Sequence, residues 1–464
     1  MIGSVYTPIA TLSKQIRDGK VSPVELVETF LNRLESLGPR YNSVVNVTRK
    51  LALKQARKAE KEIEAGEYRG HLHGVPWGAK DLLSTKGIPT TWGAEPFRDR
   101  VLNTDATVVK KLEEAGAVLC AKLNMIEFAG GMGYRQPNAS LMGPPRNPWN
   151  RETWAGGSSS GSGAAVAAGL VPFALGSETW GSILSPANNC GVAGLRPTYG
   201  RVSRHGAMAL CWTLDKLGPL AQTADDCGLI LESIAGPDPE DPTTYTEPWK
   251  YDPRNPKMKF SIGVIGGVAD DANPEVKENF EKALKTLKSV ASIGEIDLPD
   301  LPYEAITRTI LNAEAASAFE DIVDSGTTHK LTASEDHWGP YARTVLLATD
   351  YIRAMRLRGK MVKVIAEAMD PFDVLAAPSA KKPASPIDKE FRKSAPGTTK
   401  DIMGAVGNGC GLPAVSIPDG FTKSKLPTGI QFMGKPYEEN TILAIARAYQ
   451  KLTDWHTHHP PLES

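Results

Sequence analysis

Residues 156–163 read Gly-Gly-Ser-Ser-Ser-Gly-Ser-Gly and hold the densest group of hydroxyl side chains in this 464-residue sequence. Eight Gly or Ser residues in a row are typical of a flexible linker. Here, however, residues 164–170 are small, apolar and helix-compatible, and residues 171–175 have the pattern of a buried strand. A Gly/Ser loop held between packed elements brings hydroxyls and backbone N–H groups close to a ligand. We therefore expect a serine-based site, which extends into a second such segment at residues 176–183.

Lys80 is a second chemical candidate, at the end of the strand-like residues 73–81. Its neighbours include Gly, Ala, Trp and Leu, and burial among them would lower the pKa of the amine. A lysine with such a pKa is available as a base near neutral pH. Most lysines lie at the surface, so this position alone does not separate a base from a surface side chain.

Several serine-enzyme patterns can be placed on the chain. Residues 157–161 match a nucleophile elbow with Ser159 at its centre, but residues 150–154 make a poor preceding strand. Residues 379–382 match Ser-x-x-Lys, although Pro378 and Pro383 argue against the helix that this motif needs. The Gly-rich loop lacks the Gly-Lys-Ser/Thr ending of a phosphate-binding loop. His205 could serve as the base of an ordinary serine-histidine triad. If it does not, the remaining possibility is a serine nucleophile with a lysine as its base.

Composition excludes several function classes. The chain has 53 basic and 53 acidic residues, so no overall field attracts nucleic acid or a membrane surface. We see no signal peptide and no bilayer-length apolar run. The five cysteines are scattered without metal spacing, as expected for free thiols in a reducing compartment. We expect a cytoplasmic globular protein without a metal site.

The elements that must position these residues alternate between strand and helix patterns along the chain. This alternation predicts an α/β fold with a mixed β-sheet core covered by helices on both faces. The Pro-rich loop at residues 237–243 looks like a boundary, but strands on both sides could join one sheet. We expect one large domain over residues 1–464. It would comprise an N-terminal helical layer (1–68), a core with the chemical motifs (69–235) and a second part that completes the sheet and pocket (236–464).

Several long motifs, in this order, resemble the amidase signature family. They are residues 74–81 around Lys80, 156–159 with the following small-residue helix, 180–183, 190–203, 214–220 and 426–431. The resemblance extends over most of the chain. It implies the amidase signature fold and a catalytic triad of Lys80, Ser158 in a cis peptide, and the nucleophile Ser182, with no cofactor.

The mechanism that the resemblance implies is a proton relay. Neutral Lys80 takes a proton from Ser158, Ser158 takes one from Ser182, and Ser182 attacks the carbonyl carbon. Backbone N–H groups between Thr179 and Ser182, including those of Trp180 and Gly181, would bind the oxyanion. Gly131 and Met132, in the Gly-rich segment 130–134, would form another wall of the pocket.

The sequence departs from the family pattern beside the nucleophile. Trp180 replaces a glycine, Leu184 replaces an arginine, and Glu178 stands where Asp is usual. We therefore expect a pocket for an apolar or aromatic acyl or amine group.

The expected function is hydrolysis of carbonyl C–N bonds in linear amides, and the sequence leaves aryl amides and carbamates open. The partner would be a small-molecule substrate, and a homodimer is open as well. The alternative is the amidase subunit of a glutamyl-tRNA amidotransferase, which would require partner subunits. A third possibility is a catalytically dead scaffold. The complete set of Lys80, Ser158 and Ser182 argues against it.

Overall fold

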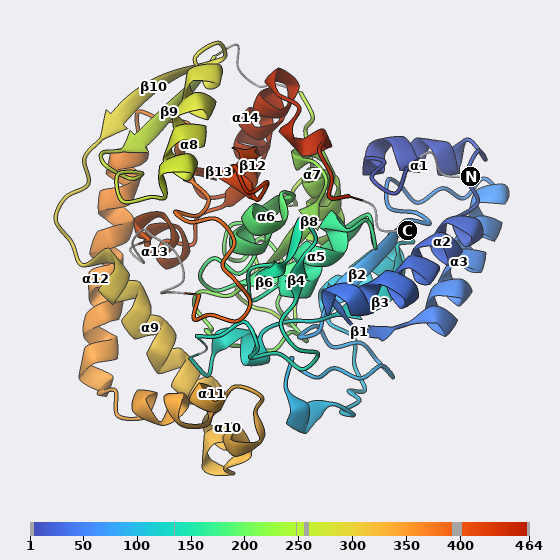
Figure 1. Cartoon of the computed structure of the whole chain (residues 1–464), viewed down its shortest axis with the longest axis horizontal. Helices are drawn as coiled ribbons and strands as arrows, with labels where there is room; N and C mark the ends of the chain where they lie inside the picture. Colours follow the sequence, from blue (N-terminus) through green and yellow to red (C-terminus); the bar gives the residue numbers. More distant parts are fainter. Residues whose placement is uncertain (1–3, 134, 247, 255–258, 392–400, 462–464) are drawn as a thin grey trace.

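A mixed β-sheet runs through the centre of the computed structural model, which describes residues 4–133, 135–246, 248–254, 259–391 and 401–461 (Figure 1). Within these residues the sheet has 11 strands in the order β1-β3-β2-β6-β8-β7-β12-β13-β11-β9-β10. The strands are β1 Val44–Val47, β2 Pro76–Lys80, β3 Val118–Leu123, β6 Phe173–Glu178, β7 Ala193–Arg196, β8 Lys216–Ala221, β9 Phe260–Ile265, β10 Ala291–Ile296, β11 Val374–Pro378, β12 Ala414–Phe421 and β13 Pro427–Gly434. A separate two-stranded sheet pairs β4 (Arg146–Asn147) with β5 (Asn150–Trp154).

Helices surround the central sheet (Figure 1). They are α1 Ile9–Arg17, α2 Pro23–Leu37, α3 Arg49–Glu64, α4 Thr107–Glu114, α5 Ser160–Ala167, α6 Leu184–Cys190, α7 Ala224–Ile234, α8 Pro274–Leu287, α9 Tyr303–Ala318, α10 Glu320–Asp324, α11 Ser334–Trp338, α12 Ala348–Met369, α13 Ile402–Gly409 and α14 Glu439–Leu452. None of these described helices combines the length and the apolarity of a membrane span.

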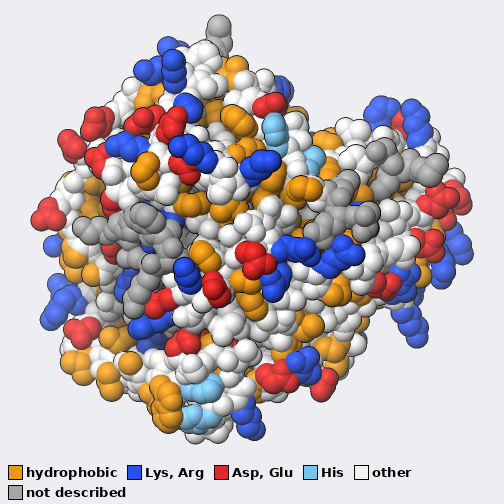
Figure 2. Space-filling model, in the orientation of Figure 1, with side chains coloured by type: hydrophobic (Ala, Val, Ile, Leu, Met, Phe, Trp, Pro, Cys, Tyr) orange, Lys and Arg blue, Asp and Glu red, His pale blue; other side chains and the backbone are white. Residues whose placement is uncertain are grey.

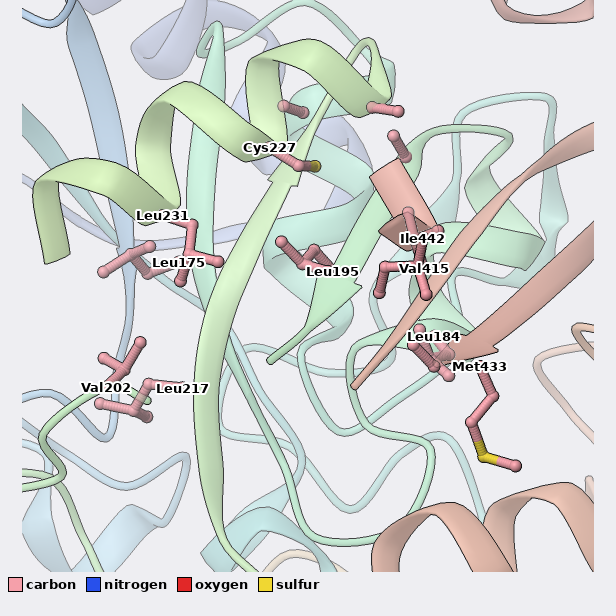
Figure 3. Close-up of a cluster of buried hydrophobic side chains, with 14 of the residues drawn as sticks. Leu175, Leu184, Leu195, Val202, Leu217, Cys227, Leu231, Val415, Met433 and Ile442 are labelled. Atoms are coloured by element: carbon pink, nitrogen blue, oxygen red, sulfur yellow. The ribbon is translucent and has the colours of Figure 1, made fainter. Parts of the chain in front are cut away.

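Side chains alternate between the two faces of the sheet, as a strand periodicity of two requires. In β6, Phe173 and Leu175 belong to the main hydrophobic core, whereas Ala174 belongs to a second core packed with α2, α3 and α5. Figure 3 shows part of the main core, where Leu184 lies near Val415 and Met433 from the C-terminal half. The expected α/β fold with helices on both faces is therefore confirmed.

The sheet also joins the two sides of the Pro-rich loop at residues 237–243. β7 pairs with β12 in antiparallel register, with Arg196 opposite Ala414. One large domain would need such a pairing; the single domain and its division at residues 68 and 235 both stay predictions. Acidic and basic side chains are interspersed on the face in Figure 2, in keeping with the balanced composition.

Three local expectations were wrong. The residue pattern predicts helices over residues 303–324 and 342–369. The first is interrupted at Phe319, whose buried ring packs edge-on against Phe128 with centroids 5.2 Å apart. The second begins only at Ala348, after the 3₁₀ turn Gly339–Arg343. Residues 150–154 do form a strand, β5, but it lies outside the central sheet that a nucleophile elbow would need.

Candidate active site

Lys80 lies at the end of β2 and is fully buried. Strand β2 pairs with β3 on one edge and with β6 on the other, which places Lys80 at the end of an interior strand of the sheet. The Lys80 Nζ atom lies within hydrogen-bond distance of three serine hydroxyls: Ser158 Oγ at 2.8 Å, Ser177 Oγ at 2.9 Å and Ser159 Oγ at 3.0 Å. Its hydrogen-bond partners among the described residues are hydroxyls and not carboxylates, an environment that suits a neutral amine, which donates to two hydroxyls and accepts from the third.

Burial lowers the pKa of Lys80 from its ordinary value of 10.5 to about 7. Asp215 and Glu178 oppose this change, because their carboxylates favour the charged ammonium. A substantial fraction of Lys80 is therefore unprotonated at neutral pH, as a general base requires.

The loop that carries Ser158 is shaped by its glycines. The peptide bond between Gly157 and Ser158 is cis. Gly156 has φ +86°, and a Cβ there would come within 2.9 Å of the Pro186 backbone. Helix α5 begins directly afterwards at Ser160, and the Ser159 N–H donates to the Ser182 carbonyl at 3.2 Å. This bond joins the loop to the segment that carries the expected nucleophile.

Ser182 lies in the turn between β6 and α6, and Glu178 anchors that turn. Glu178 Oε2 accepts the N–H groups of Ile183 (2.9 Å) and Leu184 (3.1 Å). Glu178 Oε1 accepts from Arg196 Nη1 at 2.8 Å, and both side chains are fully buried. Burial would raise the pKa of Glu178, but Arg196 and Lys216 outweigh this effect and hold the pKa below its usual value. The carboxylate therefore stays charged and fixes the turn.

Three successive N–H groups of this turn are left for a ligand. Within the described residues, the backbone N–H groups of Trp180, Gly181 and Ser182 donate to no protein acceptor. Gly181 has φ +81°, the left-handed conformation that glycine adopts readily. Such a turn can bind an anionic oxygen.

A cavity of about 1030 Å³ opens at this turn. Its walls include Thr179, Trp180, Gly181 and Ser182, as expected for the substrate side. The wall from the Gly-rich segment differs from the expectation. It consists of Ala129, Gly130 and Gly133, whereas the Met132 side chain is fully buried in the main core and Gly131 is not part of the lining. Tyr134, in the same predicted wall, lies outside the described residues.

Trp180 is held between two charged side chains at the cavity wall. Its Nε1–H donates to Asp401 Oδ2 at 2.9 Å, and the Arg308 guanidinium lies 5.0 Å from its ring. The lining is thus less apolar than the sequence suggested, because it includes several charged residues, of which Glu178 and Arg196 have fully buried side chains. The charged residues of the lining are Arg135, Glu178, Arg196, Arg308, Glu335, Arg343, Lys381, Lys382 and Asp401.

The other sequence patterns do not form catalytic arrangements. His205 is part of no described wall of this cavity, and its nearest ionic partner is Glu240 at 4.0 Å. Ser379 Oγ accepts from Ser416 Oγ at 2.7 Å, and residues 379–382 follow strand β11 without forming the helix that the Ser-x-x-Lys motif needs. No cluster of three metal-ligating side chains occurs among the described residues.

Sequence reasoning missed several residues around the site. Ser177, the third acceptor of Lys80, adjoins Glu178 in the motif, and its position next to the strand end could have identified it. Asp215 accepts from Thr179 Oγ1 at 2.6 Å and falls within the motif at residues 214–220. Asp401 and Arg308 come from distant helical segments, and no sequence signal pointed to them.

Comparison with known proteins places this chain in a family. The family model described as Amidase matches residues 25–443. The chain is 35% identical to a glutamyl-tRNA(Gln) amidotransferase subunit of Coxiella burnetii over 98% of this chain and 99% of the relative. It is 36% identical to the protein of the same name from Thermosynechococcus vestitus, with 98% and 99% covered.

Solved structures of similar proteins also superpose on this chain. The peptide amidase of Stenotrophomonas maltophilia superposes with a TM-score of 0.88 at 28% identity, covering 99% of both chains. The corresponding glutamyl-tRNA(Gln) amidotransferase subunit of Thermotoga maritima gives 0.83 at 27% identity, with 100% of both chains covered. The chain therefore belongs to the amidase signature family and is a hydrolase that acts on C–N bonds.

Proposed function

We propose that the protein hydrolyses linear amides, including aryl amides and carbamates, through Lys80, Ser158 and Ser182. The observation that supports this proposal most is the buried hydrogen bond from Lys80 Nζ to Ser158 Oγ beside the Ser182 turn. A hydroxyl both donates and accepts, so Ser158 can pass a proton from Ser182 to the neutral amine.

The proposed reaction has two halves. Ser182 Oγ bonds to the carbonyl carbon while its proton moves through Ser158 to Lys80, and the N–H groups of the turn bind the oxyanion. The C–N bond then breaks as the leaving amine takes the proton back, which leaves an acyl ester on Ser182. Water attacks this ester, the acid is released, and the Ser182 hydroxyl is restored.

The last link of this relay forms with substrate bound. Within the described residues the Ser182 hydroxyl makes no hydrogen bond to the protein, and the residue is 7% exposed at the cavity wall. Catalytic hydrogen bonds are often long without substrate and shorten in the reacting complex. The Ser182 hydroxyl is accordingly available to a substrate carbonyl.

The test is hydrolysis of a panel of amides, aryl amides and carbamates by the wild type and by Ser182→Ala. We expect amine release by the wild type and its loss in the variant, together with loss of labelling by a fluorophosphonate. Labelling that persists in Ser182→Ala would overturn the assignment of the nucleophile. A wild type that is neither labelled nor active would indicate that the protein is a catalytically dead scaffold.

A second candidate function is supported by the sequence relatives. Both cited relatives are named as a subunit of glutamyl-tRNA(Gln) amidotransferase, and they match along their whole length. If this chain shared that role, it would copurify with companion subunits from its host and release ammonia from glutamine. A stand-alone monomer or homodimer that is active on aryl amides and inert to glutamine would exclude it.

A further inference from the structure

Arg308 is a basic residue in the lining of the substrate cavity. It extends from α9, lines the same cavity as Ser182 and lies over the Trp180 ring, two residues before the proposed nucleophile. Within the described part of the chain it forms no ion pair or hydrogen bond. A guanidinium attracted to an aromatic face can still direct N–H groups to a second partner. These groups match the geometry of a carboxylate.

Asp401, on the other side of Trp180, is already occupied. Its Oδ2 accepts the Trp180 indole N–H at 2.9 Å, and its Oδ1 accepts the Gly404 N–H at 2.8 Å at the start of α13. Asp401 therefore has two N–H partners, and no ion pair joins it to Arg308 within the described residues.

The charged residues that line the cavity are predominantly basic. Its described lining has six basic residues (Arg135, Arg196, Arg308, Arg343, Lys381 and Lys382) and three acidic ones (Glu178, Glu335 and Asp401). Glu178 pairs with Arg196 and Lys381 with Asp271, whereas Arg308 has no ion pair within the described residues. A cation without a counter-charge at the cavity wall favours an anionic ligand.

We propose that Arg308, which lies over the Trp180 ring, binds a carboxylate of the substrate, and that the preferred substrate is an amide or carbamate with one anionic group. The inference rests on the proposed hydrolase function and narrows its substrate class.

Two matched substrate pairs test the proposal, one for each side of the scissile bond. On the acyl side, the para-nitroanilide of succinic acid is compared with that of isocaproic acid, in which an isopropyl group replaces the carboxylate. On the amine side, para-acetamidobenzoate is compared with para-isopropylacetanilide. The enzymes are the wild type, Arg308→Met, Arg308→Lys and the control Arg353→Met, which removes an arginine that is 73% exposed and pairs with Asp350.

In the wild type we expect kcat/KM to be about tenfold higher, or more, for the anionic member of one pair, because charge-assisted bidentate contacts are strong. Arg308→Met should raise KM for that substrate and leave its neutral partner unchanged, and Arg308→Lys should fall between the two. Arg353→Met should behave as the wild type. Equal rates within both pairs, or a preference that survives Arg308→Met, would overturn the proposal.

A binding measurement separates this inference from the proposed function. Titration calorimetry of succinate and para-aminobenzoate into Ser182→Ala needs no turnover. We expect one of these anions to bind and Arg308→Met to weaken that binding about tenfold. Binding without hydrolysis of any substrate would contradict the proposed function alone, and hydrolysis of neutral substrates without binding of either anion would contradict the carboxylate site alone.

Discussion

Lys80 Nζ and Ser158 Oγ lie 2.8 Å apart, although 78 positions of sequence separate the two residues. A neutral amine has two N–H bonds and one lone pair, whereas Lys80 has three hydroxyl neighbours, so one of these hydroxyls donates to the lone pair. The Ser159 hydroxyl already donates to the Ser177 carbonyl at 3.2 Å. Ser158 can therefore direct its proton towards the amine, which is the direction that the proposed relay needs.

Replacing Lys80 tests the proposed base. We expect Lys80→Met to lower kcat/KM for an aryl amide by about 10²–10⁴-fold, the usual contribution of a general base. Labelling of Ser182 by a fluorophosphonate should slow in parallel, because the same base activates the nucleophile. The exposed Lys86, changed to Met, provides the control and should leave both rates unchanged. Equal labelling of Lys80→Met and the wild type would contradict the role of Lys80.

The pH dependence follows from the lowered pKa of Lys80. Below about pH 7 the amine is protonated and cannot accept a proton, so kcat/KM should fall tenfold per pH unit on the acid side. Above pH 7, kcat/KM should approach a constant value. A rate profile between pH 5 and 9 measures the midpoint.

Lys216 provides the control for this assignment. Burial and the neighbouring Arg196 also lower its pKa to about 7, and its Nζ donates to Asn408 Oδ1 at 2.8 Å. Lys216→Met should keep the acid limb with its midpoint near 7, because Lys216 does not contact Ser158. If kcat/KM of this variant no longer fell on the acid side, the group that titrates near pH 7 would be Lys216.

Ser159 and Ser160 form a matched pair at the start of α5. The Ser159 hydroxyl accepts from Lys80 and from the Ser177 N–H, whereas the buried Ser160 hydroxyl has no partner among the described residues. We expect Ser159→Ala to lower kcat about tenfold by loosening the position of the amine, a loss equivalent to one ordinary hydrogen bond. Ser160→Ala should stay within twofold of the wild type. Similar losses in the two variants would point to packing as the cause.

Glu178 stabilises the fold and also holds the turn that carries Ser182. Glu178→Ala leaves the fully buried Arg196 without its carboxylate and the N–H groups of Ile183 and Leu184 without an acceptor. Breaking a buried ion pair in this way costs about 3–5 kcal/mol in the free energy of unfolding, which urea denaturation measures. In contrast, Glu95→Ala removes an exposed pair with Arg98 and should cost less than about 1 kcal/mol. Comparable losses in the two variants would show that the Glu178 pair is not a structural anchor.

The sequence predicted the parts of the fold that depend on local pattern. β9 (Phe260–Ile265) and α14 (Glu439–Leu452) begin and end where their hydrophobic periodicity does, and Ser22 caps α2 by accepting the Glu25 N–H. The long motifs around Lys80, Ser158 and Ser182 were likewise sufficient to indicate the family. These features are encoded within short stretches of chain.

The remaining features depend on contacts between distant segments. Phe319 interrupts a helix because its ring packs against Phe128, and Met132 turns into the core instead of lining the cavity. Trp180 was noticed as a departure from the family pattern, but its bond to Asp401 and its stacking with Arg308 could not be anticipated from residues 176–183. Such pairings depend on how α9 and α13 pack against the sheet.

The hydrogen bond between Trp180 and Asp401 spans 221 positions of sequence, and β7 likewise pairs with the much later β12. On the ribosome, the segment with Lys80, Ser158 and Ser182 therefore emerges well before the strand that covers the edge of β7. Until β12 and β13 are synthesised, the nascent chain holds an unpaired strand edge and an incomplete catalytic pocket. Chaperones that shield strand edges during translation are consequently expected to matter for the yield of this protein, and a chain stopped before residue 414 would be inactive and prone to aggregate.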